Sequence, residues 1–183
     1  MVFLKKIYVI RHCKAEGQLP NAQLTEEGRE QAKKLAEFFS GQDIDRIISS
    51  PFQRAIQSIE PLSKALHIEI ELDQQLTEKV LSNKDMSDWL LKLRDTFTDM
   101  TLRFDGGESS QEAMNRIAGV VNRLFDDDKS NAVIVTHGNL LALLLKYYND
   151  EFGFEDWKKL SNPDVFQLTK QANSVTYERL WIE

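Results

Sequence analysis

Short apolar runs alternate with longer amphipathic segments along this chain. Runs rich in β-branched and aromatic residues, typical of buried strands, occur at 4–10, 44–48, 132–135, 165–168 and 175–180. Ile68, Ile70 and Leu72 alternate with acidic residues, which predicts one more strand with an exposed face. The pattern therefore predicts six strands spread over the whole chain.

Helical periodicity fills most of the intervals between these strands. It predicts helices over 25–39, 52–66, 109–125 and 140–148. Thr25 can cap the first helix, Pro61 predicts a bend or break in the second, and Ser109 begins a capping box for the third. The polar stretch 73–108 contains one further amphipathic helix, with an apolar face formed by Met86, Trp89, Leu90, Leu93 and Phe97.

Alternating strands and helices predict an α/β fold, with a mostly parallel central sheet and helices on both faces. The chain has 183 residues, of which 42% are hydrophobic. This length and composition suit a single domain over 1–183, within which the polar stretch 73–108 is a short insertion between strands. We expect Trp89 and Phe97 to form the core of this insertion.

The charge balance limits the classes of partner. Lys and Arg number 23 against 29 Asp and Glu, which gives a net charge of −6 and argues against general binding of nucleic acid or of anionic membranes. The single cysteine, Cys13, excludes an intramolecular disulfide and fits a reducing compartment. No signal-peptide pattern or membrane-length apolar run occurs, so we expect a cytoplasmic protein. The sequence carries no signal of oligomeric state.

Four cationic or titratable side chains follow predicted strands. Arg11 and His12 come directly after the first strand, Arg54 lies in the first turn of the helix after the second, and His137 follows the strand at 132–135. Ligands of open α/β sheets bind outside the carboxyl ends of the strands, so these side chains are expected to converge. A local cationic cluster in an acidic protein suits an anionic substrate.

Three chemistries compete for this cluster. A metal site built on His12 and His137 with a carboxylate is disfavoured, because Arg11 and Arg54 would repel a divalent cation. A cysteine-nucleophile phosphatase needs an arginine six positions after the cysteine, and Leu19 stands there instead. Phosphoryl transfer to a neutral His12 uses every member of the cluster, with the arginines stabilising the phosphoryl oxygens.

Five segments resemble the histidine phosphatase superfamily, also called phosphoglycerate mutase-like, and together they cover nearly the whole chain. They are Tyr-Val-Ile-Arg-His-Cys-Lys-Ala-Glu (8–16), Leu-Thr-Glu-Glu-Gly-Arg-Glu-Gln-Ala (24–32), Ile-Ser-Ser-Pro-Phe-Gln-Arg-Ala-Ile-Gln-Ser (48–58), Gly-Gly-Glu-Ser (106–109) and Val-Thr-His-Gly-Asn (135–139). The resemblance implies that His12 becomes phosphohistidine and that Arg11, Arg54 and His137 hold the phosphate. Backbone amides near Gly138 and Asn139 would add donors at a helix start.

The resemblance also implies an acid for the leaving group. The family places a glutamate shortly after the third strand, where Glu78 stands, and a neighbouring phosphate dianion favours the protonated carboxyl group. Gln18 stands where the mutase branch has an asparagine and is a further candidate ligand for phosphate. Cys13 replaces the glycine that usually follows the catalytic histidine and is interpreted as a small apolar filler.

The segment between Gln18 and Leu24 is shorter than in mutases and the insertion 73–108 is short, which favours a small phosphatase. We expect this lid insertion, which carries Arg94 and Arg103, to select the substrate. The expected substrate is a small phosphorylated metabolite, and no metal or other cofactor is expected because the arginines supply the positive charge. Two alternatives stay open: phosphoryl transfer of the phosphoglycerate mutase type, and a member of the family that binds a phosphorylated ligand without catalysis.

Overall fold

A six-stranded sheet forms the centre of the computed structural model, which describes residues 4–128 and 131–182. The order of the strands across it is β3-β2-β4-β1-β5-β6. In chain order the strands are β1 (Lys6–Arg11), β2 (Arg46–Ser49), β3 (Ile70–Leu72), β4 (Asn131–Thr136), β5 (Asp164–Gln171) and β6 (Ser174–Arg179). The first four are parallel, whereas β5 is antiparallel to β1 and β6 is antiparallel to β5.

The helices lie mainly in the intervals between the parallel strands. They are α1 (Glu26–Phe38), α2 (Gln53–Leu66), α3 (Trp89–Thr98), α4 (Ser110–Asp126), α5 (Gly138–Tyr148) and the short α6 (Phe154–Lys158). Thr25 accepts a hydrogen bond from the Gly28 amide and caps α1, and Ser109 forms a reciprocal capping box with Glu112 at α4. Local side-chain chemistry thus fixes where these two helices begin.

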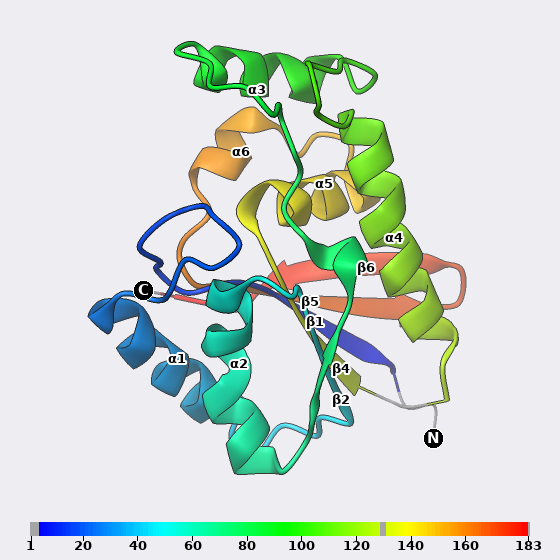
Figure 1. Cartoon of the computed structure of the whole chain (residues 1–183). Helices are drawn as coiled ribbons and strands as arrows, with labels where there is room; N and C mark the ends of the chain where they lie inside the picture. The colour runs from blue at the N-terminus through cyan, green and yellow to red at the C-terminus, as the bar shows by residue number, and fades with distance from the viewer. Residues whose placement is uncertain (1–3, 129–130, 183) are drawn as a thin grey trace.

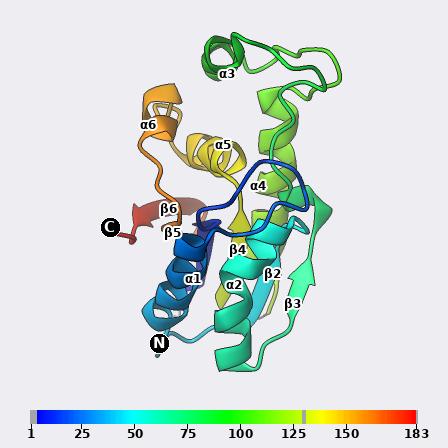
Figure 2. The same ribbon diagram turned by 60° about the vertical axis from the view of Figure 1, so that its left-hand side comes forward.

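Side chains on opposite faces of the sheet enter two separate apolar layers. In β1, Ile7 and Val9 pack with the layer under α4 and α5, whereas Tyr8 and Ile10 pack with the layer under α1 and α2. Figure 2 shows α1 and α2 on one side of the sheet and α4 and α5 on the other. Because both faces are buried, the strands read as nearly continuous apolar runs.

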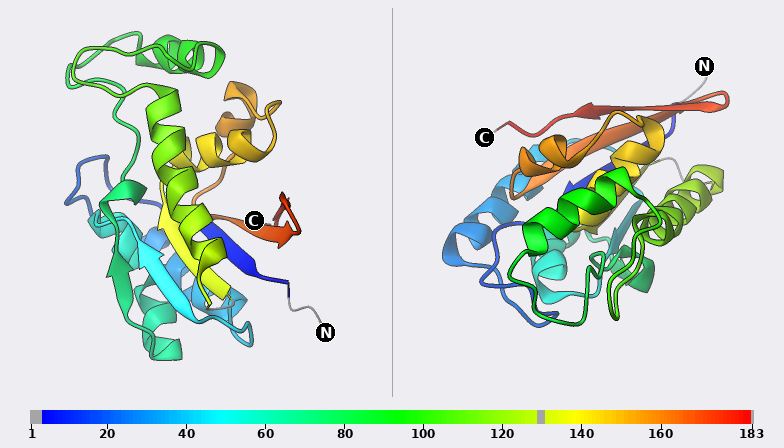
Figure 3. Two further views of the ribbon diagram at one scale, coloured as in Figure 1. Left: turned by 90° about the vertical axis from the view of Figure 1, so that its right-hand side faces the viewer. Right: turned by 90° about the horizontal axis from the view of Figure 1, so that it is seen from above.

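Helix α3 stands apart from this sandwich. In Figure 1 and in the left view of Figure 3 it lies beyond α5 and α6, at the end of the molecule farthest from α1 and α2. Phe97 is buried on its inner side and meets Phe154 of α6 edge-on, with ring centroids 6.1 Å apart. None of the helices in the described ranges is long and apolar enough to cross a membrane.

The mostly parallel α/β fold predicted from the sequence is confirmed. α2 continues through Pro61, so of the bend or break predicted there the break is absent. Two local predictions were wrong. β3 begins only at Ile70, and Leu72 is 58% exposed because this short strand forms an edge of the sheet. The apolar face predicted for α3 is narrower, since the helix starts at Trp89 and Leu90 is exposed.

Candidate active site

Parallel strand pairing brings two histidines together at the carboxyl edge of the sheet. Arg11, the last residue of β1, is in register with Thr136, the last residue of β4. The next residue of each chain segment is a histidine, and the ring centroids of His12 and His137 are 5.1 Å apart. Both imidazoles are buried. The convergence expected at this edge of the sheet is therefore present.

The tautomer of His12 follows from its hydrogen bonds. Its Nδ1 lies 2.7 Å from the carbonyl oxygen of Cys13, which can only accept, so Nδ1 carries the proton and Nε2 keeps a lone pair. Nε2 accepts a hydrogen bond from Nε of Arg54 at 3.2 Å. Burial, with the charges of Arg54 and Arg11, lowers the pKa of His12 to about 3. His12 is therefore neutral, with its lone pair directed at a guanidinium.

Arg54 is buried in the first turn of α2 and is only 1% exposed. One terminal nitrogen donates to the backbone carbonyls of Gln18 at 3.0 Å and Leu19 at 2.9 Å, and the guanidinium lies over the ring of Phe52. Gln18 also lines the adjoining cavity, and its bond to Arg54 is made by its backbone carbonyl. The loop before α1 thus holds Arg54 against His12.

Arg11 is held by the loop before β5. Its NH1 donates to the carbonyl of Leu160 at 3.0 Å, in the loop before β5. Burial lowers the pKa of this guanidinium, and the negative charges of Glu78 and Asp164 counteract that effect. Its Nε is buried and has no hydrogen-bond partner in the described chain. Arg11 therefore presents an unused donor at the site.

His137 sits at the start of α5. Its Nε2 lies 2.8 Å from the hydroxyl of Ser50, and its Nδ1 is buried without a partner among the described residues. Ser50 also accepts from the Phe52 amide at 3.3 Å, so its own proton is available for the imidazole. Burial, reinforced by the charges of His12 and Arg54, lowers the pKa of His137 well below its ordinary value. Like His12, it is neutral at neutral pH.

Glu78 lies in the loop after β3 and caps α5. Its carboxylate accepts hydrogen bonds from the backbone amides of Asn139 at 3.0 Å, Leu140 at 2.9 Å and Lys79 at 2.8 Å. The amide of Asn139 was expected to bind phosphate, and here Glu78 occupies it. A phosphate can use this amide only if Glu78 moves, so that role stays a prediction.

A cavity of about 530 Å³ opens beside this cluster, and Arg11 reaches its wall, whereas His12, Arg54 and His137 are not among the residues that line it. Its polar wall consists of Arg11, Gln18, Glu78, Lys79 and Asn139, and its apolar wall of Leu81, Trp89, Leu93 and Trp157. Within the described ranges, five buried side-chain polar atoms lack a hydrogen-bond partner, and four of them belong to Arg11, Lys79, His137 and Asn139. Nε of Arg11, Nζ of Lys79 and a protonated Nδ1 of His137 are donors, whereas Oδ1 of Asn139 is an acceptor. Unpaired buried polar atoms are costly, so their concentration here favours a polar ligand that offers mainly acceptors.

Two features of the site were predicted differently or missed. Trp89 was expected in the lid core, but it is 50% exposed and lines the cavity. Lys79 and Trp157 were not predicted as cavity residues. Lys79 could have been noticed because it adjoins Glu78, whereas no sequence pattern marks Trp157, which lies on the unpredicted helix α6.

Cys13 fills the position where glycine is usual in the resembling family. Its side chain is fully buried in the layer under α1 and α2, and its amide donates to the Ser58 hydroxyl at 2.8 Å. Burial raises the pKa of the thiol to about 12. These surroundings agree with an apolar filler and leave no reactive thiolate beside the site.

Gly106 and Gly107 anchor the loop that carries Glu78. Gly106 has a positive φ of 68°, and an added Cβ there would meet the side chain of Asn83 at 2.2 Å. At Gly107 a Cβ would lie 2.1 Å from the carbonyl oxygen of Leu81. The Glu108 amide then donates to the Val80 carbonyl at 2.9 Å. The two glycines therefore allow the end of the lid segment to pack directly on the loop of the site.

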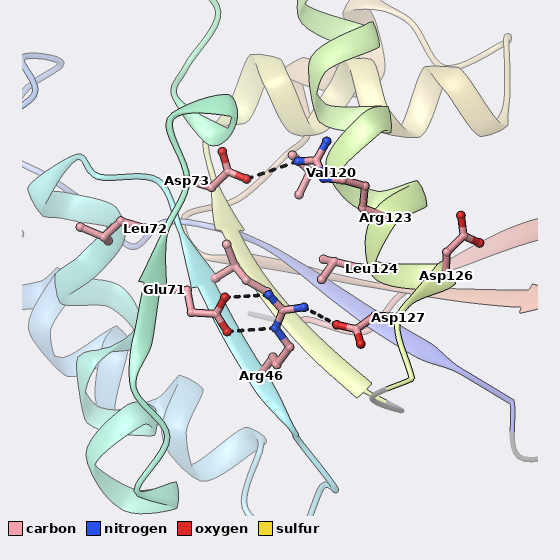
Figure 4. Close-up of a pocket in the computed structure, with 10 residues that line it drawn as sticks. Arg46, Glu71, Leu72, Asp73, Val120, Arg123, Leu124, Asp126 and Asp127 are labelled. Carbon is pink, nitrogen blue, oxygen red and sulfur yellow. Dashed lines mark hydrogen bonds and ion pairs between the residues drawn. The ribbon is translucent and has the colours of Figure 1, made fainter.

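A second hollow lies away from the histidines, between β2, β3 and the end of α4 (Figure 4). Arg46 bridges Glu71 at 2.6 Å and Asp127 at 2.5 Å, and Arg123 pairs with Asp73 at 3.6 Å. Asp126, which also lines the hollow, pairs with Lys170 outside it at 3.5 Å. The charged side chains of the hollow are therefore already engaged in ion pairs. In the described part of the chain, no three His, Cys, Asp or Glu side chains lie close enough to hold a metal ion.

The fold and the site together define an α/β protein with a neutral histidine in a cationic pocket at the carboxyl edge of its sheet. Residues 7–180 match the sequence model of the histidine phosphatase superfamily (branch 1). The chain belongs to this superfamily.

Known relatives include several phosphatases. The chain is 28% identical over 159 residues to a 6-phosphofructo-2-kinase/fructose-2,6-bisphosphatase of Caenorhabditis elegans, covering 80% of this chain but only 34% of that protein. A phosphoserine phosphatase mutant of Entamoeba histolytica, solved with phosphoserine, superposes with a TM-score of 0.78 at 20% identity, covering 94% of each chain. A mycobacterial glucosyl-3-phosphoglycerate phosphatase gives 0.76 at 22% identity, covering 96% and 97%. These two structures establish the likeness of the fold.

Proposed function

We propose that this protein hydrolyses small phosphomonoesters through a phosphohistidine on His12, without a metal or other cofactor. The observation that supports this most is the state of His12, a buried neutral imidazole whose Nε2 lone pair is free of a proton. Such a nitrogen is a competent nucleophile toward phosphorus. The phosphatases among its relatives favour the same reaction.

The phosphoryl group is bound by donors that have no other partner. A phosphoryl group offers three oxygens that need hydrogen bonds, and Nε of Arg11 and Nδ1 of His137 are unused. If the Ser50 hydroxyl donates to Nε2 of His137, then Nδ1 carries the proton and can donate to phosphate. Arg54, already 3.2 Å from the nucleophile, supplies charge at the point of attack.

The reaction proceeds in two steps. First, Nε2 of His12 attacks phosphorus, the N–P bond forms, the bond to the ester oxygen breaks, and Glu78 gives its proton to the leaving oxygen. Water then attacks phosphorus and gives a proton to the Glu78 carboxylate. The N–P bond breaks and inorganic phosphate leaves. Before the first step Glu78 must be protonated and must release the amides of α5 that it caps.

The test is direct trapping of the phosphoenzyme. Wild type, His12→Ala and the control His67→Asn are incubated with p-nitrophenyl phosphate and then quenched in base, where phosphohistidine survives and phosphoesters of carboxylates do not. His67 ends α2 in the left-handed region with φ 55°, a conformation that asparagine tolerates. Wild type and the control should form the adduct and release phosphate, and His12→Ala should lose both by about a thousandfold or more.

Three results would contradict the proposal. The first is release of phosphate by wild type without a phosphoenzyme. The second is a His12→Ala protein that keeps more than about a tenth of the rate. The third is loss of activity with a chelator that only a divalent cation restores. Parallel assays of phosphoglycerate interconversion separate a mutase from a phosphatase, and phosphate binding without turnover would indicate a non-catalytic member of the family.

A further inference from the structure

Lys79 is a buried cation that the proposed reaction does not use. It is 5% exposed and is the one lysine among the buried side chains of the described ranges. Its Nζ has no hydrogen-bond partner there. Burial lowers the pKa of its ammonium group, which reflects the cost of holding this charge away from water.

The neighbouring carboxylates attract Lys79 but are bound to other groups. Glu78 is held by backbone amides, and Glu108 forms an ion pair with Arg116 at 2.9 Å. Neither lies within 4.0 Å of the Lys79 Nζ, although both carry the opposite charge. The ammonium group therefore faces negative potential without the direct contact that would satisfy its donors.

The position of Lys79 relates it to the leaving group. It follows Glu78, the proposed acid, and lines the same cavity. The loop that carries both residues is fixed at each end. The Thr136 hydroxyl donates to the Leu76 carbonyl at 2.8 Å, and the Glu108 amide donates to the Val80 carbonyl at 2.9 Å. Lys79 thus belongs to the wall next to the leaving oxygen, whereas Arg11, Arg54 and His137 surround the phosphoryl group.

The rest of this wall is apolar, with Trp89, Trp157 and two leucines. In such surroundings a cation binds an anion more strongly than it would in water. We propose that Lys79 binds a second anionic group, a carboxylate or a second phosphate, on the leaving group of the substrate. Its Nζ is covered in the unliganded protein, so the flexible four-carbon side chain turns into the cavity to make this contact.

This inference rests on the proposed phosphatase activity, and matched substrates test it. 3-Phosphoglycerate and glycerol 3-phosphate differ by a carboxylate in place of a hydroxymethyl group, and fructose 1,6-bisphosphate and fructose 6-phosphate differ by a second phosphate. In wild type, kcat/KM should be higher for the substrate that carries the second anionic group in at least one pair. In Lys79→Met that preference should fall about tenfold to a hundredfold, as expected for loss of a charge-assisted hydrogen bond. Lys79→Arg should restore most of it.

Lys84→Met is the matched control, because Lys84 belongs to the same segment but is exposed and paired with Asp105 at 2.5 Å. It should keep the wild-type preference in both pairs. If Lys79→Met lowers the rates of both members of each pair by the same factor, Lys79 acts on Glu78 or on the loop, and the inference is wrong. If wild type hydrolyses neither these esters nor p-nitrophenyl phosphate, the proposed function itself fails. The substrate pair whose preference depends on Lys79 shows whether the second anionic group that Lys79 binds is a carboxylate or a phosphate.

Discussion

Gly138 gives the sharpest test of how the phosphoryl site is built. It is the first residue of α5 and is buried next to the guanidinium of Arg11. A Cβ added at this position would lie 2.8 Å from Nε and 2.9 Å from both Cζ and NH2 of that side chain. Carbon contacts are favourable at about 3.5–4.0 Å, so Gly138→Ala must displace the guanidinium by about 1 Å.

The displacement should affect catalysis far more than stability. Arg11 is held by the Leu160 carbonyl at 3.0 Å, so moving its guanidinium misplaces the unpaired Nε for which we propose the role of a phosphoryl ligand. A misplacement of about 1 Å in a positioned group costs about a hundredfold in rate. The added Cβ contacts the end of a side chain rather than the backbone, and alanine stabilises a helix more than glycine does. We therefore expect the free energy of unfolding to change by no more than about 1 kcal/mol.

Gly119→Ala is the matched control within α4. The nearest atom to its added Cβ is NH1 of Arg123 at 3.7 Å, an ordinary contact. This variant should keep the wild-type rate and gain about 0.5–1 kcal/mol in the free energy of unfolding. Steady-state kinetics with p-nitrophenyl phosphate and urea unfolding measure both effects. If Gly138→Ala lowers kcat/KM by less than about threefold, the position of the Arg11 guanidinium does not limit catalysis and the reasoning is refuted.

The sequence pattern predicted the parallel part of the sheet because buried strands and capped helices leave strong local signals. The apolar runs gave β1, β2 and β4, and Thr25 and Ser109 marked the starts of α1 and α4. The same pattern did not show that β5 turns back against β1. β5 and β6 extend beyond their apolar runs to a tight turn at Ala172, which adopts a positive φ of 51° without a glycine to signal it.

The residues of the site likewise divide into those that a local sequence pattern predicts and those that tertiary packing alone places. Arg11, His12 and His137 could be placed from the sequence because Arg11 ends β1 and the two histidines directly follow β1 and β4. The register of β1 with β4 then brings them together. Glu78 accepts a hydrogen bond from the Asn139 amide at the start of α5, although the two residues are 61 positions apart in the sequence. This capping bond depends on tertiary packing, so no local pattern predicts it. The burial of Lys79 likewise has no local signal, because a lysine in a polar loop is exposed in most proteins.

Two further predictions concern proton donation by Glu78 and the protonation of His12. Glu78→Gln removes the proposed proton donor, so kcat/KM for an alkyl phosphate should fall about a hundredfold or more. The loss should be smaller for p-nitrophenyl phosphate, because its leaving group departs without protonation. Equal losses for both esters would contradict the acid role of Glu78. His12 has a pKa of about 3 in the folded protein and about 6.5 when unfolded, so below about pH 6.5 the unfolded chain binds the extra proton. Acidification from about pH 7 to about pH 5 should therefore lower the free energy of unfolding by about 2 kcal/mol through this group, and His137, whose pKa is also lowered, acts in the same direction. Urea unfolding at both pH values measures the loss, and His12→Asn should show a smaller one. An identical pH dependence in the two proteins would mean that His12 is not held neutral by burial.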